Sequence, residues 1–213
     1  MRALVIVFAL FLSGCAADRA IPVQYDFDGT ADPAGPAQWQ GALDATIAVP
    51  PVIAPPWLRT TALVYRLSYR PPAMPRAYTL SQWVSPPAEL LTHRLRQAVE
   101  AQNGGITRRR ISPVSTEYGL EVSLDTFAQI FSSPDRSRCR VALRATLVEY
   151  GSRVIAQKTF TAEAAAPSPD AAGGVEGLVD ASDIDIRNIV TWLRETLETA
   201  STAASTESGR IPR

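Results

Sequence analysis

The stretch YGLEVSLDTFAQIF, residues 118–131, alternates apolar and polar side chains along its first eight positions. Successive side chains of a strand point to opposite faces of a sheet, so this period of two predicts a strand with one dry and one wet face. The runs CRVALRATLVEY (139–150) and RVIAQKTFTAEA (153–164) follow it, each after a short turn. Together the three segments predict an antiparallel meander.

A helix is predicted just upstream of the meander, in the run AELLTHRLRQAVEAQ that starts at Ala88. Ser85 can cap this helix, Pro86 suits its first turn, and Asn103-Gly104 suits its end. Leucines and alanines recur along one side of the run with helical spacing. The pattern is typical of a helix that packs one face against a core.

A second helix is predicted downstream of the meander, in VEGLVDASDIDIRNIVTWLRETLETA (175–200), after a Gly/Ala/Pro-rich linker at 164–174. Its apolar stripe comprises Ile186, Ile189, Val190, Leu193 and Leu197. Asp180, Asp183 and Asp185 then fall near the N-terminus of this helix, where the helix dipole favours acidic side chains.

The remaining strands are predicted at residues 23–27 (VQYDF) and 42–50, with a hairpin formed by 62–70 and 77–80. The order of strands, helix, three strands and helix favours the α+β class. We expect a mainly antiparallel sheet with two helices packed on one face, in a single domain over residues 23–199. The polar composition of residues 200–213 predicts a disordered tail.

The beginning of the chain has the features of an export signal. Met1-Arg2 gives a positive start, and ten apolar residues, ALVIVFALFL (3–12), follow. A helix of that length spans about 15 Å, half of a bilayer core, which suits a signal peptide better than a membrane span. Leu-Ser-Gly-Cys (12–15) then resembles the bacterial lipobox, whose cysteine is acylated and becomes the first residue of the mature chain.

This resemblance predicts a signal peptide at residues 1–14, lipidation of Cys15 and a lipidated tether at 15–22. The alternatives are an ordinary signal peptide with a chance cysteine, or a buried N-terminal helix. Ala16 and Ala17 follow Cys15, so the chain lacks the aspartate that retains such lipoproteins in the inner membrane. We therefore expect a bacterial protein anchored by lipid to the outer membrane, on its periplasmic side.

Composition excludes some classes of partner and chemistry. Acidic and basic residues number 21 each, so nothing indicates binding to nucleic acid. Cys139 begins a strand on its apolar side, which predicts a buried core residue rather than a reactive thiol. His93 is the only histidine, and neither a histidine-rich nor a cysteine-rich metal site can form from this sequence.

We identify no catalytic residue, no metal site and no cofactor. A G-x-S-x-G elbow and a nucleotide-binding G-x-x-x-x-G-K-[ST] loop are both absent from the sequence. A hydrolase with a spatially assembled triad around His93 stays as a third alternative.

Two sequence features are candidates for contact with a partner. Arg108, Arg109 and Arg110 form the only basic run, which is either a solvated edge or a contact to headgroups or an acidic surface. Trp57, after Pro55-Pro56, is the tryptophan best placed for an exposed anchor, with burial as the alternative. Trp83 is expected to pack against the first turn of the following helix, and Trp192 to border the core.

The ordered set of these pieces resembles the ABC-type transport auxiliary lipoprotein family, to which PqiC-type lipoproteins belong. The pieces are the lipobox, VQYDF, LVYRLSYRPPAMPRAYTLSQWVSPPAELLTHRL (63–95), YGLEVSLDTFAQIF and IVTWL (189–193). The Gly/Pro-rich loop after Phe27 and the prolines between Pro50 and Pro56 depart from the family pattern.

This resemblance implies a docking subunit without catalysis, in a system that moves phospholipid or other hydrophobic compounds between membranes. Its partners would be an MCE-type periplasmic substrate-binding protein, an ABC permease and an ATPase, and a homo-oligomer stays open. The alternative is an outer-membrane assembly lipoprotein that chaperones or plugs a β-barrel.

Overall fold

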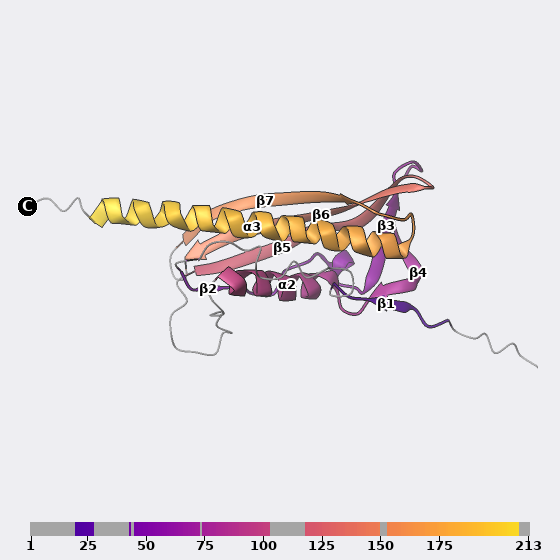
Figure 1. Cartoon of the computed structure of the whole chain (residues 1–213), viewed down its shortest axis with the longest axis horizontal. Coiled ribbons are helices and arrows are strands. Elements are labelled where there is room, and N and C mark those ends of the chain that lie inside the picture. Colours follow the sequence, from indigo (N-terminus) through magenta and orange to yellow (C-terminus); the bar gives the residue numbers. More distant parts are fainter. Residues whose placement is uncertain are drawn as a thin grey trace, which may run out of the picture.

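The computed structural model describes residues 20–27, 43, 45–72, 74–102, 118–149 and 153–208. A seven-stranded sheet with the order β1-β4-β3-β5-β6-β7 forms one layer, and β2 pairs with β5 beside this path. Two helices, α2 (Pro87–Gln102) and α3 (Ala171–Ser208), form the other layer. Figure 1 shows α3 running along β5, β6 and β7, with α2 beside it. The α+β class predicted from the sequence is confirmed.

The predicted meander consists of β5 (Tyr118–Ser133), β6 (Arg136–Glu149) and β7 (Arg153–Ala165), all antiparallel. Its inner face is dry, because apolar side chains of the three strands stand in register: Leu124 pairs with Leu143, and Leu143 pairs with Phe160. Its outer face carries ion pairs between neighbouring strands, such as Arg144–Asp125 at 2.8 Å and Arg140–Glu163. Burial of one face thus fixes the register of the meander.

The other half of the sheet contains β1 (Val23–Tyr25), β2 (Ile47–Ala48), β3 (Ala62–Leu67) and β4 (Pro75–Trp83). The predicted hairpin is present as the antiparallel pair β3–β4, but β1–β4, β2–β5 and β3–β5 are parallel. The sheet is therefore mixed, although mostly antiparallel. Between β3 and β5 the chain includes α2, which gives the crossover that a parallel pair requires.

Trp83 marks the centre of the core under this half of the sheet. It is fully buried at the end of β4, and its ring packs edge-on against Phe27 and Phe127 at 5.5 and 5.6 Å between centroids. The expectation that Trp83 packs against the first turn of α2 missed these two aromatic partners, because they come from segments remote in sequence. Trp192, as expected, borders the core, with its ring 5.8 Å from that of Phe160.

The start of α3 differs from the sequence prediction. β7 continues to Ala165 and α3 begins at Ala171, so little of the predicted linker at 164–174 remains. Asp170 caps the helix, since its side chain accepts a hydrogen bond of 2.9 Å from the Gly173 amide. This bond is the largest cause of the lowered pKa of Asp170. Asp180, Asp183 and Asp185 consequently lie within the helix, and not at its N-terminus as predicted.

Two glycines let α3 approach the meander closely. A Cβ atom on Gly174 would stand 2.3 Å from the Oε1 atom of Gln129, and one on Gly177 would stand 2.8 Å from both the Ala165 carbonyl and the Cys139 sulfur. The Cys139 thiol donates to the Gly174 carbonyl at 3.2 Å across the same contact. Glycine is thus required here by a close approach of helix to sheet.

The far end of α3 also differs from the prediction. The helix continues to Ser208, whereas the sequence predicted a disordered tail from residue 200. Along the last exposed turns, hydroxyl groups donate to carbonyls of the preceding turn, as from Thr199 to Glu195 at 2.8 Å. Figure 1 shows these turns extending past the end of the sheet. No helix within the described ranges is both long and apolar enough to cross a membrane.

Candidate functional site

The predicted site residues fall in different parts of the chain. Cys15 and the run Arg108, Arg109 and Arg110 lie outside the described residues. Trp57 lies in a short 3-10 helix, η3 (Pro56–Leu58), and 66% of it is exposed. The structure therefore places Trp57 where a partner can reach it.

The two residues considered for catalysis, Cys139 and His93, differ in their burial. Cys139 is buried, as predicted, and burial raises the pKa of its thiol to about 12, with a smaller contribution from the charge of Asp180. Such a thiol is protonated at neutral pH and is a poor nucleophile. His93 is exposed on α2. No group of three or more His, Cys, Asp or Glu side chains suitable for a metal occurs among the described residues.

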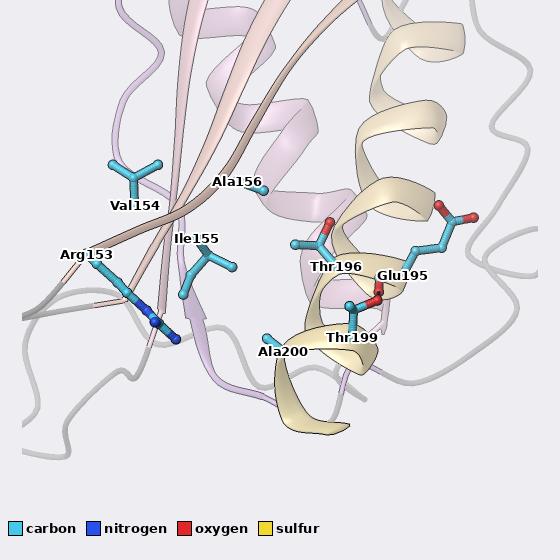
Figure 2. A pocket seen from close by; sticks show the side chains of 8 residues that line it. All are labelled: Arg153, Val154, Ile155, Ala156, Glu195, Thr196, Thr199 and Ala200. Carbon is cyan, nitrogen blue, oxygen red and sulfur yellow. Dashed lines mark hydrogen bonds between the residues drawn. The ribbon is translucent and has the colours of Figure 1, made fainter. Parts of the chain in front are cut away.

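A groove lies between the beginning of β7 and the C-terminal half of α3, with a volume of about 490 Å³. Four residues line it from β7 (Arg153, Val154, Ile155 and Ala156) and four from α3 (Glu195, Thr196, Thr199 and Ala200). Figure 2 shows Ile155 pointing toward α3, while the carboxylate of Glu195 points away from β7. The groove therefore has apolar and hydroxyl walls, with its one acidic side chain turned outward.

The same groove borders an open sheet edge. β7 is the last strand in the described order, so the outer edge of its 13 residues has no strand beside it there. Val154 on this edge is 61% exposed. Two basic side chains belong to this strand: Arg153 forms an ion pair with Glu149 at 3.6 Å, and the ammonium of Lys158 lies 5.3 Å from the Phe160 ring centroid. A groove beside an unpaired edge can accept an added strand.

Buried polar groups in the helix–sheet layer were missed by the sequence analysis. Gln129 is fully buried on the inner face of β5, where its side chain accepts from the Tyr78 hydroxyl at 2.8 Å and donates to Ser137 and to the Asp170 carbonyl. Burial is the main cause of a raised pKa at Tyr78. Alternation of polar and apolar residues marks β5 as a strand, but it cannot show which polar residue finds partners inside.

The two helices are joined by an ion pair that local patterns could not indicate. Arg94 of α2 donates two hydrogen bonds to Asp183 of α3, at 2.8 and 2.7 Å, and both side chains are about one-fifth exposed. This bidentate geometry fixes the orientation of α2 against α3. The ion pair lies between α2 and α3, and neither of its residues lines the groove.

The fold and the groove together define a two-layer α+β domain with an open sheet edge at β7. The model of a family described as "ABC-type transport auxiliary lipoprotein component" matches residues 25–185. The chain therefore belongs to the ABC-type transport auxiliary lipoprotein family, and the resemblance seen in the sequence is confirmed. The family description connects its members with ABC-type transport systems.

Solved structures show the same fold at low sequence identity. A protein from Xanthomonas campestris is 19% identical, with a TM-score of 0.66 over 86% of this chain and 98% of that chain. A second crystal structure, of an uncharacterized protein, is 16% identical, with a TM-score of 0.61 over 81% of this chain and 99% of that chain. At these identities the likeness concerns the fold alone. A comparison with curated protein sequences finds no match.

Proposed function

We propose that the protein is a docking subunit without catalysis, in an ABC/MCE-type system that carries phospholipid or other hydrophobic compounds between membranes. The proposal includes a lipid anchor at Cys15 and a place on the periplasmic side of the outer membrane. The family match over residues 25–185 carries the proposal. The sequence LSGC and the absence of aspartate after Cys15 support the anchor and its membrane.

The β7 edge and the adjoining groove suit the docking role. An extended segment of the MCE-type partner would add to the edge of β7 and place an apolar side chain in the groove between Ile155 and Thr199. Lys158 favours an acidic side chain in that segment, and Figure 2 shows that the Glu195 carboxylate, which would repel one, points away from β7. Main-chain hydrogen bonds would supply affinity, and the groove would select the side chain.

The anchor is tested by replacing Cys15 with serine. A serine hydroxyl does not replace the thiol in lipoprotein acylation, so we expect complete loss of palmitate labelling and release of the chain from the membrane fraction. Stable anchoring needs at least two buried chains, so partial acylation should also weaken retention. Cys139 provides the control, since Cys139→Ser should keep full labelling. Labelling that persists in the Cys15→Ser chain contradicts the anchor.

The docking surface is tested by Val154→Asp, with Met74→Asp as a control of matched exposure, 61% against 58%. Aspartate at the edge of β7 puts a charge into the desolvated contact and repels an acidic segment, so affinity for the purified MCE-type protein should fall by about tenfold or more. Met74→Asp should leave affinity unchanged.

Titration calorimetry with the native acylated chain in detergent measures both variants. Equal affinities for the two variants contradict docking at β7. Binding to a purified β-barrel protein, without binding to the MCE-type protein, would favour the assembly alternative.

A further inference from the structure

The only lysine of the chain lies on the open edge of the sheet and points to its inner face. Lys158 of β7 pairs in register with Ala145 of β6, and Phe160, two residues on, pairs with Leu143. Ala145 and Leu143 are buried in the core, so Lys158 shares the inner face, on which α3 packs. Lys158 is nevertheless exposed, because β7 ends the sheet in the part of the chain that the structure describes.

We propose that Lys158 prevents the β7 edge from pairing with the β7 edge of a second copy, and so keeps the edge available to a different partner. An unpaired edge can accept any strand that fits it, and an inward-pointing charge is one of the features that protect such edges. The inference goes beyond the proposed function, because it concerns a second copy of this chain and its test needs no other protein.

Apart from Lys158, the β7 edge is well suited to pair with an identical strand. Thr159 and Thr161 are exposed on it, and threonine is frequent in strands. The strand contains neither proline nor glycine along its 13 residues. A bulge interrupts the ladder only near its beginning, between Val154 and Ala156, and residues 157–165 pair regularly with β6. The geometry of the edge therefore does not exclude self-pairing, and a side chain has to do so.

A second copy would offer Lys158 no carboxylate from the paired strand. In an antiparallel pair, opposed side chains stand on the same face of the sheet. The only carboxylate of β7 belongs to Glu163, which is on the outer face and pairs there with Arg140. In every antiparallel register of two β7 strands, Lys158 therefore has no acidic residue opposite it. Its ammonium would lose water without gaining an ion pair, which is unfavourable.

A strand from a different protein can satisfy Lys158. A carboxylate on the inner face of that strand would lie opposite Lys158 and pair with its ammonium, and opposite charges across two strands are favourable. Lys158 thus discriminates between partners of the edge, since it disfavours an identical strand and favours an acidic one.

Lys158→Met tests the inference. Methionine keeps an unbranched, polarizable side chain beside the Phe160 ring and removes the charge. Lys158→Arg is the matched control, because it keeps the charge at the same position. Sedimentation equilibrium of the acylated full mature chain, in a detergent matched in density to the solvent, measures the dimerisation constant at neutral pH. We expect Lys158→Met to dimerise about tenfold or more tightly than the native chain, and Lys158→Arg to resemble the native chain.

Hydrogen exchange then locates the contact. In the Lys158→Met dimer, amides within residues 157–165 should exchange more slowly than in the monomer, and amides of β4 should not change. Equal dimerisation constants for the native chain and Lys158→Met overturn the inference, as does a Lys158→Arg chain that dimerises like Lys158→Met. A dimer without slower exchange in β7 also overturns it, because another surface then forms the contact. None of these outcomes alters the tests of the anchor or of binding to the MCE-type protein.

Discussion

Replacing Asp185 with asparagine should stabilise the protein by about 4 kcal/mol at pH 8 and change its stability little at pH 4. Asp185 is fully buried on α3, and neither oxygen of its carboxyl group has a hydrogen-bond partner of normal geometry among the described residues. Burial raises the pKa of this carboxyl from 3.8 to about 7, and the nearby Ala162 backbone offsets the rise only in part. A difference of about three pKa units corresponds to about 4 kcal/mol.

The direction follows from proton binding. Between about pH 4 and pH 7 the folded chain keeps the proton on Asp185 while the unfolded chain releases it. Stability therefore falls as pH rises through this window, and above about pH 7 the full cost of a buried charge is present. Asparagine resembles the protonated acid in shape and carries no charge at any pH, so the variant loses this pH dependence.

Urea unfolding at several pH values between 4 and 8 measures the effect. Asp180→Asn is the matched control, because Asp180 is an exposed acid on the same helix, and its substitution should leave the pH profile nearly parallel to that of the native chain. Profiles for Asp185→Asn that run parallel to the native profile would show that Asp185 is ionised in the folded protein.

Trp83→Ala should lower the free energy of unfolding by about 3–5 kcal/mol, since it removes a large buried aromatic side chain and leaves a cavity. Trp83 is fully buried, and Phe27 and Phe127 pack against its ring and stack on each other at 6.2 Å between centroids. The truncation thus removes the edge-on partner of two further rings, which keep only their contact with each other. The affected core joins β1, β4 and β5, so β1 should lose its attachment first.

Trp57→Ala gives the control for this prediction, because Trp57 is 66% exposed and its removal should change stability by less than about 0.5 kcal/mol. Chemical unfolding followed by circular dichroism compares the two variants. Losses of equal size would contradict the central place of Trp83 in the core. Hydrogen exchange at β1 amides tests the order of the loss, and β1 amides that stay as protected as those of β6 would contradict it.

Local pattern was sufficient for the meander and the two helices. Alternation along residues 118–131 and 139–150 reports which face of each strand is dry, and short turns leave an antiparallel pair as the simple solution. The parallel pairs β1–β4 and β3–β5 join segments far apart in sequence, and no local sequence pattern predicts that these strands are partners. The buried position of Cys139 followed from the same alternation, and it is confirmed.

Two errors in the sequence analysis have a common cause, which is that tertiary contacts override local composition. Gly173 and Gly174 lower helix propensity, so the sequence predicted a linker there. The structure uses Gly174 inside α3, because a larger residue would meet Gln129 of β5. Asp185 was likewise expected near a helix end on account of its charge, and it lies in the core. The groove also escaped prediction, since its two walls come from β7 and the last turns of α3.

The length of the meander sets the distance between the two ends of the molecule. β5 runs for 16 residues, or up to about 50 Å at 3.3 Å per residue. Figure 1 shows β1 toward one end of this span and the last turns of α3, which border the groove, at the other. If the proposed lipid anchor at Cys15 holds β1 beside the membrane, a partner bound in the groove would lie well above the headgroups. The sheet would then act as a rigid spacer that holds the docking groove in the periplasm, away from the membrane surface.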